Sequence, residues 1–124
     1  MRDLKNVIDF ANSLAPAART ATGTGTGVDL QGYNGAVVFF HVGTITDGTH
    51  TPKLQESADN STFTDVAAAD LEGTLAALAT SVNQEAGYKG TKRYVRAVST
   101  VSGATTGGVY AASIVRGHAV KQPV

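Results

Sequence analysis

The stretch LQESADNSTFTDV (residues 54–66) decides how the chain folds. It alternates apolar and polar residues from Leu54, reaches a cluster of turn-forming residues, and resumes its apolar positions at Phe63 and Val66. Two alternating runs joined by such a cluster are typical of a β-hairpin. We therefore expect a hairpin with its tip at Ser57–Thr62 and with Leu54, Phe63 and Val66 packed inward.

Further strand signals lie on both sides of this hairpin. GAVVFFHVG (35–43) is a β-branched and aromatic run between glycines, which predicts a strand buried on both faces. TDGTHT (46–51) follows it, and its Asp-Gly pair is a strong turn signal. KRYVRAVSTV (92–101) and VYAASIVRG (109–117) alternate on either side of SGATTGG, which predicts a long antiparallel hairpin.

Only short pieces of the sequence favour helix. An apolar stripe with i, i+3, i+4, i+7 spacing is formed by Leu4, Val7, Ile8 and Ala11. This spacing over residues 3–14, closed by Pro16, fits a short amphipathic helix or a docking arm. VAAADLEGTLAALAT (66–80) is rich in alanine but interrupted by glycine, so we expect one helical turn near 67–72. TATGTGTG (20–27) predicts a flexible loop, and it lacks the residue order of a phosphate-binding P-loop.

The predicted fold is all-β and mainly antiparallel, a small β-sandwich or barrel with an N-terminal arm or short helix. Strands recur at about ten-residue spacing, separated by turn residues, as in sandwiches and barrels. We assign residues 1–16 to the arm or helix and residues 17–124 to a single sandwich-like domain. With 42% hydrophobic residues but no Trp and only four Phe, the core must be built mainly from small aliphatic side chains.

Composition excludes several classes of protein. The formal net charge is zero, which argues against a nucleic-acid partner. Residues 1–72 carry four Lys/Arg against nine Asp/Glu, a net −5, and residues 73–124 carry six against one, a net +5. Folding either mixes these charges or separates an acidic face from a basic face. No apolar run approaches 18 residues and residues 1–14 lack a signal-peptide pattern, so we expect no membrane partner and a cytosolic, unprocessed product.

Residues that could carry catalysis or bind metal are few. The histidines are His41, His50 and His118. They lack the spacings that place two imidazoles on one metal, and no G-x-S-x-G motif marks a nucleophile. Carboxylates in or beside turns are Asp47, Asp59, Asp65 and Asp70. They lack the spaced ladder of a calcium loop, so we interpret them as turn caps. We expect no enzyme activity, metal, cofactor or small-molecule substrate.

One basic cluster interrupts this neutral sequence. It consists of Lys89, Lys92, Arg93 and Arg96, with Tyr88 and Tyr94 interleaved. Such a cluster can contact an acidic protein surface or a nucleic-acid backbone. It can equally be a solvated edge strand whose charges prevent sheets from aggregating.

Residues 28–118 resemble a family of small virion structural proteins of tailed bacteriophages and prophages. The most telling blocks are TDGTHTPKLQESADNSTFTDV (46–66) and GTKRYVRAV (90–98). The resemblance implies a β-rich, non-enzymatic protein on the capsid surface of the virion, which decorates or stabilises the head. It also implies contacts with the major capsid protein and a homo-oligomer, with a trimer favoured. The family offers no catalytic residue to transfer.

We expect the arm and the basic strand to make the contacts with capsid and protomers. The residues concerned are Leu4, Val7, Ile8, Lys89, Lys92, Arg93 and Arg96. The alternative is a tail or adhesion module that holds a surface carbohydrate or protein at its hairpin tips. Those tips, DGTH, ADNST and SGATTGG, contain no aromatic residue that could stack on a sugar ring. A small hydrolase or metal enzyme is the least favoured class.

Overall fold

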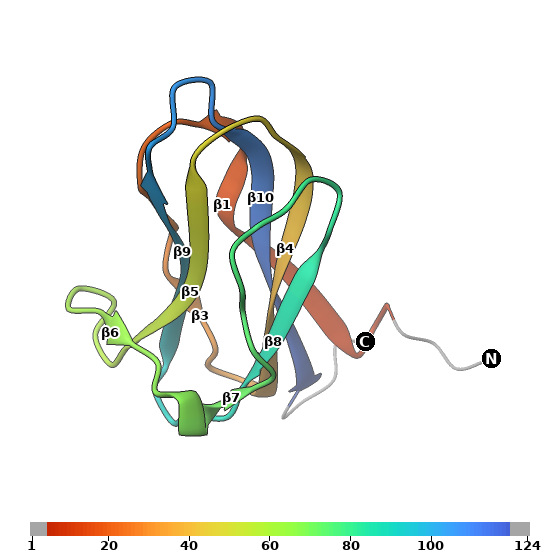
Figure 1. Ribbon diagram of the computed structural model, residues 1–124. Helices are drawn as coiled ribbons and strands as arrows, with labels where there is room; N and C mark the ends of the chain where they lie inside the picture. Colours follow the sequence, from red (N-terminus) through yellow and green to blue (C-terminus); the bar gives the residue numbers. More distant parts are fainter. Residues whose placement is uncertain (1–4, 120–124) are drawn as a thin grey trace.

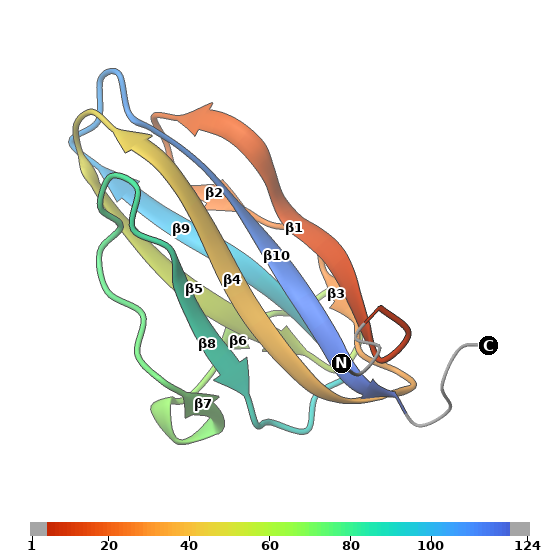
Figure 2. The same ribbon diagram turned by 90° about the vertical axis from the view of Figure 1, so that its right-hand side faces the viewer.

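The computed structural model describes residues 5–119, which form two antiparallel sheets packed face to face (Figures 1 and 2). Sheet A contains, in order, β1 (Ile8–Arg19), β10 (Gly108–Ala119), β4 (Tyr33–Ile45), β8 (Gln84–Tyr88) and β7 (Leu71–Glu72). Sheet B contains β2 (Gly23–Thr24), β9 (Tyr94–Ser102), β5 (Thr49–Ser57) and β6 (Thr64–Asp65), with β3 (Val28–Asp29) also on β9. The all-β sandwich prediction is confirmed.

Alternation along the strands builds the core between the sheets. On β4, Val38 and Phe40 point inward and are 1% and 0% exposed, whereas Val37 and Phe39 point outward and are only partly buried. Other large buried side chains of the core are Leu14, Tyr110 and Ile114 on the same sheet and Leu54 and Val95 on the facing sheet. The prediction that 35–43 is buried on both faces is therefore wrong for the single chain, because nothing in residues 5–119 covers the outer face of β4.

Of the two alternatives for the N-terminal segment, the helix is wrong, since residues 8–19 form strand β1 at the edge of sheet A. Its register pairs Ile8 with Gly117 and Asn12 with Ser113, and it shifts between Asn12 and Leu14. This bulge turns both Ser13 and Leu14 inward. The apolar spacing that suggested a helix thus belongs to a bulged strand, which runs across the expected boundary between residues 16 and 17.

The predicted hairpin of residues 92–117 is also wrong. Strand β9 pairs with β5 in sheet B, and β10 pairs with β1 and β4 in sheet A. The connection between them crosses from one sheet to the other and is anchored by Asp47. The Asp47 carboxylate accepts backbone N–H bonds from Thr105, Thr106 and Gly107, the last at 2.6 Å. These bonds, with that from Gly107 the strongest, lower the pKa of Asp47.

The hairpin at residues 54–66 is confirmed, but the prediction that Phe63 packs inward is wrong. Its ring centre lies 4.0 Å from the Arg96 guanidinium, and Arg96 points outward from sheet B. Strands β5 and β6 pair through Gln55 and Asp65, with Leu54 and Val66 buried. At the tip, the Asp59 carboxylate accepts N–H bonds from Ser61 and Thr62, both at 3.0 Å. Together with the Ser57 hydroxyl, at 2.8 Å, these donors lower the pKa of Asp59 to about 2.

Two shorter expectations have different outcomes. The single helical turn expected near 67–72 is present as η1 (Ala68–Asp70). The loop predicted at 20–27 is partly ordered, because Gly23–Thr24 forms β2 and the Gly25 N–H donates to the Ala97 carbonyl at 2.8 Å.

No helix in the described part of the chain is long and apolar enough to cross a membrane.

Candidate functional site

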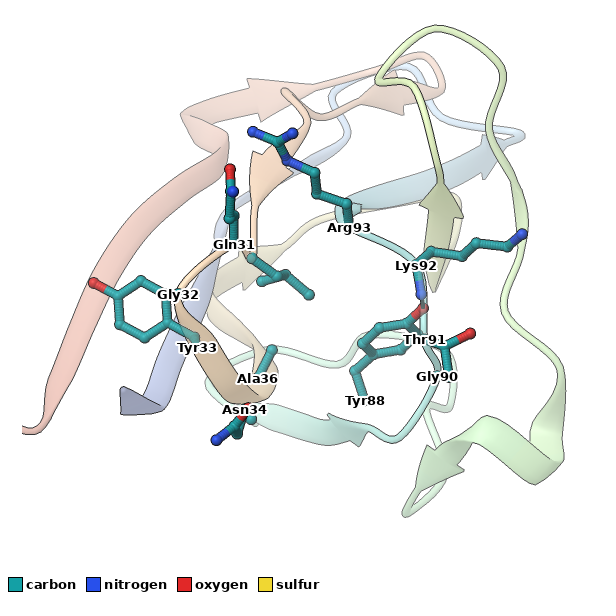
Figure 3. A pocket seen from close by; sticks show the side chains of 12 residues that line it. Gln31, Gly32, Tyr33, Asn34, Ala36, Tyr88, Gly90, Thr91, Lys92 and Arg93 are labelled. Carbon is teal, nitrogen blue, oxygen red and sulfur yellow. Dashed lines mark hydrogen bonds between the residues drawn. The ribbon is translucent and has the colours of Figure 1, made fainter. Parts of the chain in front are cut away.

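One end of the sandwich carries a pocket of about 470 Å³ between two connections, β3 to β4 and β8 to β9 (Figure 3). It is lined by residues 30–36, by Tyr88 and by residues 90–93. Three glycines within these ranges, at 32, 35 and 90, leave much of the wall to the backbone. Such a wall offers hydrogen-bonding groups to a ligand or to the backbone of another protein.

Tyr88 forms one side of the pocket and links the two sheets. Its hydroxyl donates to Glu56 Oε1 at 2.6 Å and accepts the N–H of Lys92 at 3.0 Å. Burial, and then the hydrogen bond to Glu56, raise the pKa of Tyr88 above its ordinary value. A side chain at Gly90 would collide with the Tyr88 ring, so the glycine allows the loop to lie against it. The ring is fixed and its phenol stays protonated.

A chain of ion pairs closes the neighbouring corner. Arg93 donates from Nε and Nη2 to the two carboxylate oxygens of Asp29, at 2.9 and 2.8 Å. This bidentate bond lowers the pKa of Asp29 to about 2 and raises that of Arg93. Arg116 donates to the Asp29 carbonyl at 2.9 Å, pairs with Asp9, and lies 4.9 Å from the ring centre of Tyr33. Strands β1, β3 and β10 and the connection that leads into β9 are thereby joined at this end.

The same pairs show how folding distributes the charge. Three ion pairs join the acidic half of the sequence to the basic half, namely Arg93–Asp29, Arg116–Asp9 and Lys89–Glu72. The charges of the two halves are therefore mixed by folding, and the opposite outcome, one acidic face and one basic face, is not observed in these pairs.

The structure separates the four residues of the basic cluster. Lys92 and Arg93 line the pocket, and Figure 3 shows the Lys92 side chain extending away from it. Lys89 pairs with Glu72 at 3.0 Å. Arg96 lies on sheet B, where it donates to Gln55 at 2.8 Å. Lys92 is thus the member best placed to meet a partner.

The arm residues have mixed outcomes. Leu4 lies outside the described residues. Val7 and Ile8 are partly buried at the start of β1, and Ile8 lies opposite Gly117. The Arg116 bonds to Asp9 and Asp29 bring this part of β1 to the same end of the sandwich as Arg93.

The histidines do not form a site in the structure as described. His50 is buried, with Nδ1 2.9 Å from the Tyr110 hydroxyl and Nε2 3.0 Å from the Asp47 carbonyl. His41 is exposed on the outer face of sheet A, and the side chain of His118 lies outside the description. Residues 5–119 contain no group of three or more His, Cys, Asp or Glu side chains that could hold a metal ion.

Sequence reasoning missed a second surface, the outer face of sheet A. Its outward side chains include Ile8, Phe10, Val37, Phe39, His41 and Val115. Phe10 is 65% exposed, the largest exposed fraction among the large apolar side chains described. The apolar run at 35–43 is the sequence signal for this surface, because it predicts a strand buried on both faces. The described chain buries only one of them.

Comparisons with known proteins support the fold. No protein-family model matches the sequence, and no curated protein matches it. The PBSX exported protein XepA superposes with a TM-score of 0.60 at 19% identity, over 100% of this chain and 41% of XepA. The SPBc2 prophage-derived protein YomS superposes with a TM-score of 0.53 at 18% identity, over 93% of this chain and 99% of YomS. The chain therefore has the fold of a small prophage-derived protein, in agreement with the resemblance of residues 28–118 to small phage and prophage proteins.

Proposed function

We propose that the chain is a non-enzymatic structural protein of a phage virion that binds the assembled capsid and decorates or stabilises the head. The observation that carries this proposal is the fold shared with prophage-derived YomS over 99% of that protein. At 18% identity the likeness concerns the fold. The virion role and the capsid partner come from the family resemblance of residues 28–118.

The chemistry of the pocket supports binding over catalysis. None of the described residues that line it is His, Asp, Glu or Cys. The raised pKa of Tyr88 keeps its phenol protonated, and Arg93 is held by Asp29. General acid–base catalysis needs a group that changes protonation near the working pH, and neither of these two does so.

The capsid contact is assigned to the pocket end of the sandwich. Lys92 projects from it, Arg93 and Lys89 lie beside it, and the start of β1 with Val7 and Ile8 is joined to it through Asp9. The expected contacts at Arg96 and Leu4 remain part of the proposal. Many weak contacts, repeated over the copies of a homo-oligomer on a repeating capsid lattice, give tight attachment without a deep pocket.

Immunogold electron microscopy of intact virions, with antibody raised against the recombinant chain, tests the proposal. Label over the heads is the expected result. Label confined to tails would replace it with the tail or adhesion module that binds a surface carbohydrate or protein. Particles without label would contradict a virion role altogether.

A charge reversal tests the contact itself. Lys92→Glu should weaken attachment to capsids that lack the protein by about fivefold, the scale of one exposed ion pair. Lys53→Glu makes the same charge change on sheet B, away from the pocket, and should leave attachment unchanged. Equal effects of both variants would show that only net charge matters. Deletion of residues 1–14 is not a suitable test, because it removes Leu14 from the core.

A further inference from the structure

The outer face of sheet A carries a row of apolar side chains beside a more polar row, in which Asn12, Ser113 and Glu85 lie next to Phe39. Register places Phe10 opposite Val115, and Val115 opposite Val37, so these side chains form one row across β1, β10 and β4. Directly opposed residues on one face have Cβ atoms about 5 Å apart, so the row is contiguous. Phe39 and His41 continue the surface along β4, with ring centres 6.0 Å apart.

Nothing in the described chain covers this surface. In Figure 2 sheet A faces the viewer, and no described segment passes in front of β10 or β4. Antiparallel sheets with one solvated face normally alternate apolar and polar residues, whereas near-continuous apolar runs are typical of strands buried on both faces. Strand β4 has the second pattern but only one buried face. We infer that its outer face is buried against another molecule.

The charge of the surface indicates which molecule. Among the outward side chains of β1 between residues 8 and 12, β10 between 109 and 117, β4 and β8, Glu85 is the only carboxylate, and none is Lys or Arg. Beyond it, on β7, Glu72 is neutralised by Lys89. A strongly charged partner would find little to pair with here. A second copy of the same largely apolar surface would meet no extensive like-charge repulsion.

The size of the surface suits such a pair. Strands β10 and β4 each contribute about eight residues to this face, and β1 and β8 about five each, so at about 4.8 Å per strand and 3.3 Å per residue it covers about 400 Å². Two copies together bury roughly 800 Å² of this flat area, the size of a small, weak interface.

We propose that two copies of this chain pack through the outer faces of their A sheets, related by a twofold axis along the strands. This orientation places Glu85 of each copy over β1 of the other, so the two carboxylates do not meet. Phe10, exposed in the single chain, becomes buried against the other copy. The pairing predicts two copies where the family resemblance favours three, and it does not depend on attachment to a capsid.

Sedimentation velocity and light scattering on the full chain test the pairing. At up to about 100 μM, well above the micromolar dissociation constants of weak interfaces of this kind, the mass should be twice the 12.7 kDa of one chain. Val37→Glu should weaken self-association by at least about 100-fold, because it buries an unpaired charge. Thr100→Glu, at an exposed position on the central strand of sheet B, should leave the mass doubled. Circular dichroism checks that each variant is folded.

Phe10→Glu provides a second route in case Val37→Glu does not fold, since Phe10 lies on an edge strand and is mostly exposed. A chain that stays monomeric at every concentration would overturn the proposal. So would a dimer that persists in both folded variants, which would place the contact elsewhere. A mass of three chains would overturn the twofold pairing.

A spin label distinguishes this contact from any other dimer. Because the chain contains no cysteine, Ser113→Cys and Thr100→Cys each give a single labelling site. Sheets packed face to face lie about 10 Å apart, so labels at Ser113 in two copies should be much closer than labels at Thr100. The reverse order would contradict the pairing. Loss of virion labelling with an intact dimer would reject the capsid role alone.

Discussion

The two outer faces of this sandwich differ although both belong to sheets that bury apolar side chains on their inner faces. On sheet B, the outward positions of β5 and β9 carry Tyr94 and Val98 among mostly polar residues, namely Thr51, Lys53, Gln55, Arg96 and Thr100. On sheet A the corresponding positions are mostly apolar. The chain therefore contains enough polar residues to form a solvent-exposed sheet face, and they lie on sheet B. The apolar residues on sheet A are therefore not explained by a shortage of polar residues in the chain. They agree with the proposal that a second copy of the chain buries this face.

The largest expected effect separates burial within the chain from burial between chains. Phe40 and Phe39 are adjacent on β4 and point to opposite faces. Phe40→Ala should lower the free energy of unfolding by about 3–5 kcal/mol, because it opens a cavity in the core. Phe39→Ala should cost less than half as much when denaturant unfolding is measured at concentrations where the chain is monomeric.

The same pair should behave differently at high protein concentration. Dimerisation stabilises the folded state by mass action, so the cost of Phe39→Ala should grow with concentration while that of Phe40→Ala changes little. If Phe39→Ala and Phe40→Ala lowered the free energy of unfolding of the monomer equally, the outer face of sheet A would already be buried within one chain. The proposed difference between the two faces would then be wrong.

A smaller effect is expected on sheet B, where a cation covers an aromatic side chain near its outer face. The Arg96 guanidinium lies 4.0 Å from the ring centre of Phe63. Arg96→Ala should cost about 0.5–1 kcal/mol and expose Phe63, which makes this face more like that of sheet A. Arg96→Lys keeps the charge but loses the planar stacking, and should recover only part of the loss in a thermal denaturation. Full recovery by lysine would assign the effect to charge alone.

The smallest expected effect is the loss of folding stability at acid pH. The pKa values of Asp29 and Asp59 are lowered to about 2 in the folded chain, by Arg93 and by backbone N–H groups respectively. Since these values lie below the unfolded value near 3.9, their stabilisation is fully present above about pH 5 and is lost as the pH falls toward 2. The melting temperature should therefore decrease over that interval.

Asn variants identify the source of this decrease. Asp29→Asn and Asp59→Asn should each make the melting temperature less dependent on pH between about 5 and 2. A melting temperature that keeps its full pH dependence in both variants would show that these two carboxylates are not its source.

Local signals in the sequence predicted the local elements correctly. The run at 35–43, the Asp47-Gly48 turn and the hairpin at 54–66 each depend on residues that are neighbours in the chain. The errors concern distant partners. Alternation of apolar and polar residues indicates which side chains share a face of a strand, but it does not identify the neighbouring strand. For this reason the sequences of β9 and β10 predicted a hairpin that does not form. The helical spacing at residues 4–11 was overridden by pairing with β10, which no local pattern contains.

The candidate site was predictable to a lesser degree. Lys92 and Arg93 were singled out as basic residues, but the pairing of Arg93 with Asp29 joins positions 64 residues apart. The pocket forms only because the two connections meet at one end of the sandwich. The apolar face of sheet A was signalled at 35–43, but its extension to Phe10 and Val115 depends on the strand order, which the sequence does not contain.

The pairing of Ile8 with Gly117 also has a consequence for biosynthesis. Translation at about 5–20 residues per second delivers Gly117 to the growing chain roughly 5–20 s after Ile8. For that period β1 has no partner strand, and β4 lacks the neighbour that later separates it from β1. Two residues of β1 disfavour pairing with other nascent chains during this period. Asp9 carries a charge, and Pro16 has no N–H to donate to a neighbouring strand. Sheet A is therefore completed only late in translation, and its face cannot form until then.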